Sequence, residues 1–283
     1  MATISLEGPS VVAGGLKKVS YPVPAIDFRA EINNLLIQKG FVDRIVPLEE
    51  LHLHLRPEDR VATAFNNVTR AFYETNDQFR QIYFSLMKYI AQEIFDFDFI
   101  FQATPTIRFH FPGPYEDMYR SKDGKYLGYH VDGMNGHPME EINCWLPATS
   151  CYESNALQIA SLEDGIRILN LLLDDINYNE EIYLKSGFDL NYMKLNSDPE
   201  YLRLAVNSCK PLSMKYGELL VFDPRCVHST AENQEKHTRV SLDFRLIPVE
   251  AYDKLTREYK SQGRSGRMFA RGDIFYQSSV REL

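Results

Sequence analysis

The sequence has few cysteines, no long apolar run and no excess of basic residues. Its four cysteines, Cys144, Cys151, Cys209 and Cys226, form no C-x-x-C pair. We therefore expect free thiols in or near the core, as a reducing compartment leaves them. No stretch approaches the ~18 consecutive apolar residues that a membrane-spanning helix needs, which excludes a protein built around such helices.

The charge balance is acidic, with 39 acidic against 31 basic side chains, a formal net charge of -8 and an isoelectric point near 5.4. Nucleic acids and anionic membrane surfaces select for basic faces, so neither is expected as a partner. The first residues, Met1 to Pro9, show no basic region followed by an apolar stretch of the kind an export signal needs. We therefore expect a cytoplasmic protein whose partner is a small molecule.

The length and composition predict a single domain with one large core, since the chain has 283 residues of which 44% are hydrophobic and 25% are charged. Residues 1–98 are expected to hold a loose segment, over residues 1–25, and supporting helices. Residues 99–248 are expected to form a β-rich core, because aromatic and β-branched residues dominate from Phe99 onward. Residues 249–283 follow as a tail.

Two helices are expected before the core. The first runs from Ile26 to Gly40, where the glycine ends it. Apolar residues then recur at three- and four-residue steps from Val68 to Ile94, which predicts one long helix packed against the outside of the core. Between them, His52 and His54 alternate with leucines. A surface strand explains this pattern more simply than a zinc pair, because no cysteine or third histidine stands near.

The strand pattern lapses between about residues 161 and 208, where apolar spacing from Ile166 to Ile176 predicts a helix beside acidic residues. We interpret this segment as an insertion between strands of the core. It is either a lid that folds over the mouth of the core and contacts a bound molecule, or a solvated acidic helix. Within the tail over residues 249–283, the part from Ser261 to Leu283, with Arg264, Arg267 and Arg271, is either a second flap or a frayed end.

Three residues of metal-ligand type stand in two segments of the expected core. His130 and Asp132 are one residue apart, so on a β-strand they would point to the same face and can share one metal ion. His228 follows a buried strand over Leu219–Phe222 and a turn at Asp223-Pro224. An isolated His-x-Asp is common by chance, but two imidazoles and one carboxylate together can hold one face of an octahedral iron(II) and leave three positions open.

The segment from Arg239 to Pro248 alternates strictly between polar and apolar residues, which predicts a strand with a polar inner face. The residues that share the polar face are Arg239, Ser241, Asp243 and Arg245. Charged side chains inside a barrel are costly unless they pair with one another or with a charged ligand. This strand therefore indicates an anionic small molecule bound inside the core.

Together these segments resemble the iron(II)- and 2-oxoglutarate-dependent dioxygenases. The resemblance covers roughly Thr106 to Pro248 and includes the family's His-x-Asp, distal His and Arg-x-Ser elements in their usual order. Residues 107–112, 126–132 and 141–147 are similar to the phytanoyl-CoA hydroxylase branch, and more closely to the dioxygenases of aminoglycoside and cyanotoxin (cylindrospermopsin-type) biosynthesis. The resemblance implies a mainly β fold with supporting helices, namely a double-stranded β-helix (jelly-roll, cupin-like) barrel.

The resemblance also implies roles for single residues. His130, Asp132 and His228 match the Fe(II) ligands. Arg239 matches the arginine that forks onto the distal carboxylate of 2-oxoglutarate, with Ser241 as its hydroxyl companion. Asn143 lies either near this cosubstrate or in the fold as a structural amide. Further residues either contact the substrate or serve the structure alone: Arg108, His110, Tyr129, Trp145, Asp243 and Arg245.

The implied reaction uses O2 and couples oxidative decarboxylation of 2-oxoglutarate to hydroxylation of an unactivated C–H bond in a small, polar or cationic natural product. Asp132 stands where related halogenases carry a small residue, which favours hydroxylation over halogenation. Desaturation, cyclisation and ketone formation use the same residues and stay open. A cupin-like metal-dependent isomerase or hydrolase would leave the polar strand at Arg239 unexplained. Nothing in the sequence calls for a metal-bound sensor or scaffold without turnover.

Overall fold

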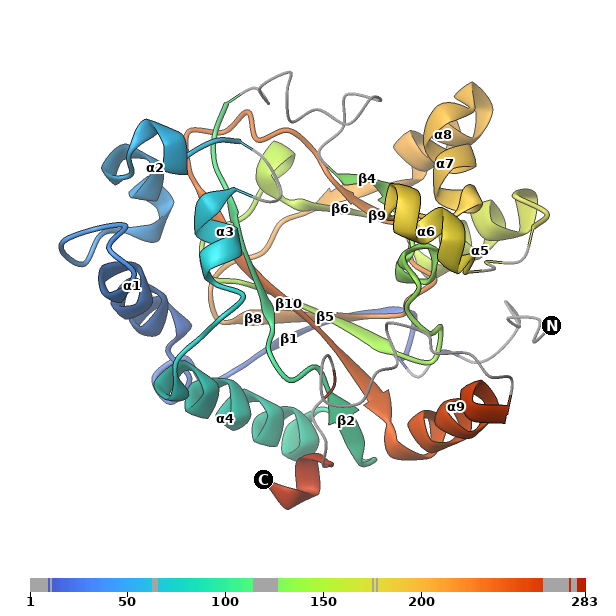
Figure 1. Ribbon diagram of the computed structural model, residues 1–283, viewed down its shortest axis with the longest axis horizontal. Helices are drawn as coiled ribbons and strands as arrows, with labels where there is room; N and C mark the ends of the chain where they lie inside the picture. The colour runs from blue at the N-terminus through green and yellow to red at the C-terminus, as the bar shows by residue number, and fades with distance from the viewer. Residues whose placement is uncertain are drawn as a thin grey trace.

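The structure, a computed structural model, describes residues 10, 12–62, 66–113, 127–174, 176, 178–261, 275 and 279–283. Two antiparallel sheets face each other in it, with helices around them (Figure 1). The larger sheet contains β1 (Leu16–Ser20), β2 (Phe99–Phe101), β3 (Thr106–His110), β5 (Ile142–Pro147), β8 (Glu218–Phe222) and β10 (Arg239–Pro248). The smaller sheet contains β4 (Leu127–His130), β6 (Leu157–Ile159), β7 (Lys210–Leu212) and β9 (His228–Thr230).

The order of the strands identifies the architecture. From β3 to β10 the chain passes back and forth between the two sheets, and the hydrogen-bonded orders are β8-β5-β10-β3 in one and β4-β9-β6-β7 in the other. Two facing four-stranded sheets with these crossings form a double-stranded β-helix, or jelly roll. The predicted fold is therefore confirmed. Strands β1 and β2 extend the larger sheet beyond this barrel, beside β8 and β10 respectively.

Strand β10 lies in the middle of the larger sheet and has the bounds that its alternation predicts. It pairs with β5 on one side and with β3 and then β2 on the other. Its apolar residues face outward, where the ring of Phe244 contacts Tyr83 of helix α4 (Asp77–Glu93) at 5.5 Å between centroids. Its polar residues consequently face the space between the sheets, because side chains alternate along a strand.

The supporting helices cover the outer face of the larger sheet, as expected (Figure 1). Helix α1 (Phe28–Gln38) is capped by Asp27 and is followed by Gly40 at φ +74, close to its predicted bounds. The single long helix predicted from Val68 to Ile94 is wrong, because α3 (Asn67–Ala71) and α4 are separate helices. The side chain of Asn76 accepts from the backbone N–H of Phe79 and so begins a new helix within the apolar stripe.

Two further expectations for the N-terminal part are wrong. Residues 16–20 are not loose but form β1, which pairs with β8 along its whole length. His52 and His54 lie on helix α2 (Leu51–His54) rather than on a strand. Leu51 and Leu55 are buried while Leu53 is 65% exposed, and this four-residue spacing is the period of a helix. The Nδ1 atom of His52 lies 2.9 Å from the hydroxyl of Thr238.

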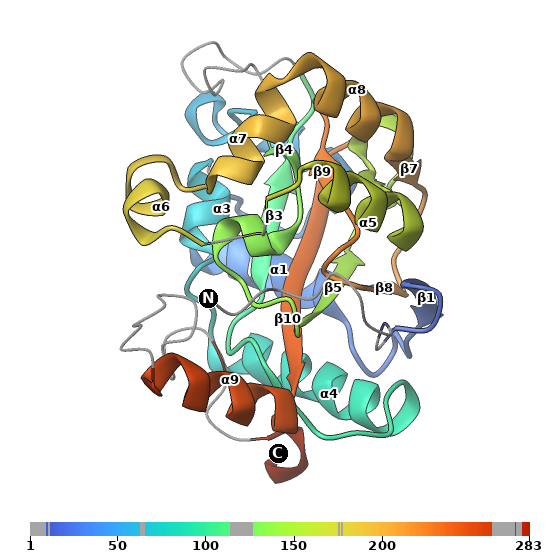
Figure 2. The same ribbon diagram turned by 90° about the vertical axis from the view of Figure 1, so that its right-hand side faces the viewer.

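The segment expected as an insertion is helical and packs beside the smaller sheet (Figure 2). Its helices are α5 (Leu162–Leu171), α6 (Glu180–Ser186), α7 (Leu190–Ser197) and α8 (Pro199–Ser208). The helix predicted from Ile166 to Ile176 ends earlier, because α5 stops at Leu171 and Leu173 is 87% exposed with a φ of 60. No helix in the described ranges is long and apolar enough to cross a membrane.

The C-terminal part begins as a helix, before the segment expected as a flap or a frayed end. Helix α9 (Val249–Ser261) follows β10 directly and lies at the end of the molecule opposite α7 and α8 (Figure 2). Tyr252 packs edge-on against Phe275, with 5.9 Å between ring centroids. Arg264, Arg267 and Arg271, on which the predicted flap depended, lie outside the described residues. All four cysteines are free and buried, as predicted.

Candidate metal centre

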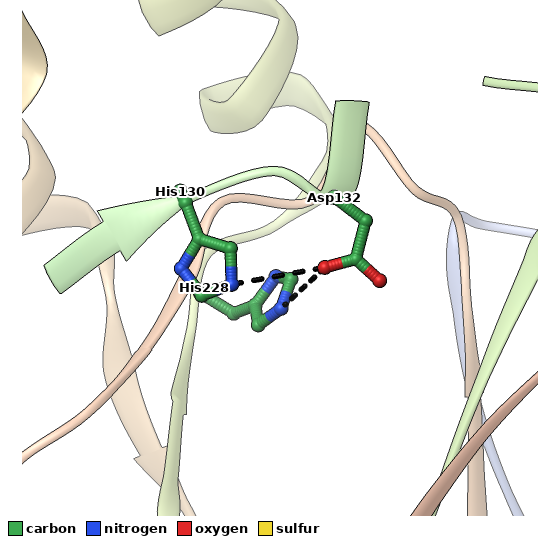
Figure 3. Close-up of side chains that lie close together, drawn as sticks. All are labelled: His130, Asp132 and His228. Carbon is green, nitrogen blue, oxygen red and sulfur yellow. Dashed lines mark ion pairs between the residues drawn. The ribbon is translucent and has the colours of Figure 1, made fainter. Parts of the chain in front are cut away.

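His130 and His228 lie directly opposite each other on neighbouring strands of the smaller sheet. They are register partners on β4 and β9, and their ring centroids are 4.3 Å apart. The Oδ1 atom of Asp132 lies 3.7 Å from Nε2 of His130 and 3.5 Å from Nε2 of His228 (Figure 3). All three side chains are buried, and within the described residues they are the one group of three or more such side chains able to hold a metal ion.

The local backbone differs from the prediction at one point. Strand β4 ends at His130, and Asp132 is the first residue of a 3-10 helix, Asp132–Asn135. Val131 between them is still extended, with φ -112 and ψ 152, so both side chains project to the same side. The pairing of β4 with β9 also shifts register between Leu127 and His130. Such bulges re-aim side chains next to functional sites.

Both histidines have the tautomer that a metal ligand requires. Nδ1 of His130 lies 2.8 Å from the carbonyl oxygen of Gly128, and Nδ1 of His228 lies 3.0 Å from that of Cys226. Because a carbonyl can only accept, each Nδ1 donates its N–H there, and each Nε2 is the ring atom that faces Asp132. Burial and the neighbouring His228 lower the pKa of His130 to about 3, so this imidazole is neutral. The backbone thus holds the rings as metal ligands are usually held.

Asp132 is ionised, and its two carboxylate oxygens have different partners. Burial alone would raise its pKa, but the guanidinium of Arg245 and the side chain of His228 outweigh burial and hold the pKa well below its usual range. Oδ2 accepts from Nε and Nη2 of Arg245 at 2.9 and 2.8 Å, while Oδ1 faces the two imidazoles. Two imidazole nitrogens and one carboxylate oxygen form the donor set that fits non-heme iron(II).

These three residues line a cavity of about 390 Å³ between the two sheets. Most of the predicted site residues line it too, namely Asn143, Arg108, Trp145, Arg239, Asp243 and Arg245. Ser241, His110 and Tyr129 do not line it. His110 is the register partner of Arg239 on β3, and burial together with Arg239 holds its pKa well below the usual range. Tyr129 packs against the inserted helices.

Arg239 is only 1% exposed, although it carries a full charge. Its guanidinium carbon lies 5.8 Å from the ring centroid of Trp145, within the range of a cation–π contact, and its Nη1 donates to the carbonyl of Asn155 at 3.1 Å. On the same sheet, two polar groups are buried without a hydrogen-bond partner in the described part of the chain: the hydroxyl of Ser241, two residues from Arg239, and the side-chain amide of Asn143, the register partner of Arg245. Buried polar groups of this kind fit a site that a ligand completes.

The carboxylate of Asp243 is paired with two arginines. Its Oδ2 accepts from Nε of Arg108 at 2.7 Å and its Oδ1 accepts from Nη1 of Arg245 at 2.6 Å. Burial raises its pKa, but Arg108 and Arg245 outweigh burial and lower it. The carboxylate therefore presents no uncompensated charge that would select a cationic substrate.

No protein-family model matches the chain. Over 215 residues the chain is 26% identical to the streptomycin biosynthesis protein StrG of Streptomyces griseus, and the match covers 74% of this chain and 78% of that protein.

The chain is also similar to several solved structures. One is the alpha ketoglutarate dependent carbocyclase SnoK from nogalamycin biosynthesis (12% identity, 83% of this chain and 80% of that chain, TM-score 0.46). Another is the epimerase SnoN in complex with Fe3+, alpha ketoglutarate and nogalamycin RO (12% identity, 83% and 79%, TM-score 0.45). The apoform of EctD from S. alaskensis is also similar (12% identity, 84% and 74%, TM-score 0.45).

Sequence reasoning missed several residues of the cavity. Gly187 and Phe188, between α6 and α7, line it, and Phe188 stacks on Tyr192 at 3.7 Å between ring centroids. No periodicity marks this pair, because it lies in a connection between two short helices. His137 also lines the cavity, with its Nδ1 3.2 Å from Oε2 of Glu141. Its turn-rich sequence context gave no sign of this buried pairing.

Proposed function

We propose that this chain is an iron(II)- and 2-oxoglutarate-dependent oxygenase that hydroxylates a small, polar natural product. One observation carries the proposal: two imidazoles and a carboxylate converge from separate segments inside one jelly roll, in a cavity that is also lined by the buried Arg239. When bound, iron, 2-oxoglutarate and dioxygen would supply the oxidising power for an unactivated C–H bond.

The residues of the chain would hold and orient these groups. His130, Asp132 and His228 would hold one face of the metal and leave the remaining positions open. Arg239 would receive the distal carboxylate of 2-oxoglutarate, because its planar fork of donors matches two carboxylate oxygens. Trp145 and the carbonyl of Asn155 support this guanidinium from the side. The unpartnered groups of Asn143 and Ser241 are available to the same ligand.

The inserted helices supply part of the wall of the cavity. Gly187 and Phe188 reach it from the connection between α6 and α7, which favours the lid interpretation of residues 161–208 over a solvated acidic helix. An aromatic side chain at this position would contact the substrate and keep water from the metal. The paired state of Asp243 favours a polar substrate over a specifically cationic one.

Two features support the type of reaction and substrate. A halogenase of this kind would have a small residue in place of Asp132. Because this chain has a carboxylate there, hydroxylation is the reaction we propose. Desaturation, cyclisation and ketone formation remain alternative outcomes of the same site. The similarity to StrG, which is named for streptomycin biosynthesis, supports a natural-product substrate. We also propose that the chain belongs to the phytanoyl-CoA hydroxylase branch, close to the dioxygenases of aminoglycoside and cyanotoxin biosynthesis. A metal-dependent isomerase or hydrolase is disfavoured because it would not need a buried arginine in this cavity.

The test is to bind 2-oxoglutarate to the iron(II)-loaded protein without oxygen and then to admit oxygen. We expect a weak visible charge-transfer band on binding and, with a panel of polar natural products, succinate and a hydroxylated product. The matched control is His228→Ala, in which we expect neither the band nor succinate. A wild-type protein with no band, and no succinate above this control, would refute the proposed oxygenase. An isomerase or hydrolase would also show no band.

A further inference from the structure

Four alternating charges run from the candidate metal centre across the wall of the cavity. Arg245 contacts Asp132 through two N–H groups, Asp243 contacts Arg245 at 2.6 Å, and Arg108 contacts Asp243 at 2.7 Å. The exposed fractions of the side chains of Arg245 and Asp243 are both 14%, and that of Arg108 is 20%. The chain of contacts therefore lies mostly out of solvent, where paired charges hold a fixed geometry better than they do at the surface.

The two carboxylate oxygens of Asp132 contact different groups. Oδ2 receives both N–H groups of Arg245, at 2.9 and 2.8 Å, while Oδ1 lies within 3.7 Å of both imidazole Nε2 atoms. Rotating the carboxylate so that both oxygens face the metal site would break the two charge-assisted hydrogen bonds to Arg245. The guanidinium thus selects which oxygen is offered as a ligand, and it offers only one.

The backbone makes this arrangement rigid. Arg245 and Asp243 are two residues apart on the same face of β10, the central strand of the larger sheet. Arg108 lies on the neighbouring strand β3, paired with Ser241 of β10. Asp243 therefore fixes Arg245 from one side and Arg108 fixes Asp243 from the other. None of these three residues is needed for the metal-ligand set itself.

We propose that Arg245 is a positioning residue that keeps Asp132 a one-oxygen ligand and so keeps three metal positions open. This inference rests on the proposed function, because it requires a metal ion on His130, Asp132 and His228. A carboxylate bound through both oxygens would occupy one of the positions that the cosubstrate and dioxygen need. Asp243 and Arg108 support the guanidinium and do not contact the ligands.

The experiment uses Mn2+ alone and counts its exchangeable waters from the water-proton relaxation of the metal-loaded protein. In Arg245→Met, Asp132 is free to turn its second oxygen to the metal and displace one water. We expect the relaxation enhancement per bound Mn2+ to fall by roughly a third relative to the wild type, from about three waters to about two. Arg245→Lys is the second variant, since it keeps a positive charge between the two carboxylates and so protects the fold. A single ammonium does not reproduce the fork, so the same fall is expected.

The matched control is Arg29→Met, which removes a half-buried arginine that contacts Glu49 and the carbonyl of Ala148 on the outer side of the larger sheet. It should leave the relaxation of bound Mn2+ unchanged. Unchanged relaxation in both Arg245 variants would overturn the positioning role, even if the wild type binds Mn2+ at this site. Failure of the proposed function looks different, because Mn2+ would then bind the wild type no better than it binds His228→Ala.

Discussion

The side-chain amide of Asn196 is bonded to both polar groups of the Tyr129 backbone. The N–H of Tyr129 donates to Oδ1 at 2.9 Å, and Nδ2 donates to the carbonyl of Tyr129 at 2.8 Å. The hydroxyl of Tyr192 accepts from the N–H of Gly128 at 3.2 Å. Helix α7 of the insertion is thus fixed to strand β4 at the two residues that precede His130, so the insertion helps to set the position of a metal ligand.

Gly128→Ala is expected to destabilise the protein and weaken metal binding. A Cβ at this position would lie 2.6 Å from the hydroxyl of Tyr192 and also too close to Oδ1 of Asn196. Overpacking of this kind costs ~1–3 kcal/mol of unfolding free energy. Urea unfolding measures the loss, and Mn2+ titration measures the effect on His130.

The double variant with Asn196→Ala is the control. If the Asn196 contact is the cause, the alanine at 128 should cost less in that background, and strictly additive costs would contradict the explanation.

Divalent metal is expected to raise the melting temperature. The ligand set is buried and ready in the folded chain, whereas the unfolded chain separates His228 from the other two residues. A ligand at about 100 times its dissociation constant stabilises the folded state by about 2.7 kcal/mol. For a chain of this size, that corresponds to a rise of several degrees. Thermal scans with and without Mn2+, and then with a chelator, measure it. His228→Ala should show no shift, and an equal shift in that variant would place the metal elsewhere.

Arg239→Met is expected to weaken 2-oxoglutarate binding without weakening metal binding. A charged hydrogen-bonded contact of this kind is worth about 1.5–3 kcal/mol, so the concentration for half-saturation should rise by roughly 10- to 100-fold. The charge-transfer band measures it. Arg239→Lys should recover little, because an ammonium lacks the planar fork. Full recovery with lysine would show that charge alone is used at this position.

The stability of the protein is expected to depend on pH through Asp189. This carboxylate caps helix α7 by accepting from the N–H of Tyr192, and its other oxygen is buried without a partner in the described part of the chain. Burial raises the pKa of Asp189 to about 6. In the unfolded chain the pKa is about 3.9. Between these two values the folded state binds more protons than the unfolded state, so unfolding free energy falls as the pH rises and levels off above about pH 6.

Asp189→Asn tests this, because asparagine also caps helices but does not titrate. Relative to the variant, the wild type should lose about 2–3 kcal/mol of unfolding free energy between about pH 4 and pH 7, as a shift of about two pKa units implies. Urea unfolding at several pH values gives the difference. A wild-type-minus-variant difference that stays constant with pH would refute the titration of Asp189.

Some of these features were readable in the sequence because they depend on alternation. Strand β10 has its predicted bounds because one face meets α4 and the other meets the cavity, so its polar and apolar residues alternate from Arg239 to Leu246. His130 and Asp132 were matched by the same logic, even though the strand ends between them. In both cases the two-residue period of a strand is enough to predict which side chains share a face.

Other features depend on contacts that no local pattern encodes. The stripe from Val68 to Ile94 continues through a break, because Phe72 joins the core although it follows the end of α3. Strand β1 was taken for a loose segment, since an edge strand with two exposed lysines carries little apolar signal. Arg245 was placed among the substrate contacts, and only the fold brings it to Asp132, 113 residues away in the chain.

Strand β10 carries three residues with different roles: Arg239 at its start, Arg245 near its end, and Phe244, which packs against α4. A deletion of one residue within it would turn every later side chain to the opposite face. Arg245 would then point at the aromatic rings of α4, and Phe244 would point at the metal ligands. Length changes during evolution should therefore be absent from β10 and accumulate between α5 and α7, where new loops can alter the choice of substrate without disturbing the centre that oxidises it.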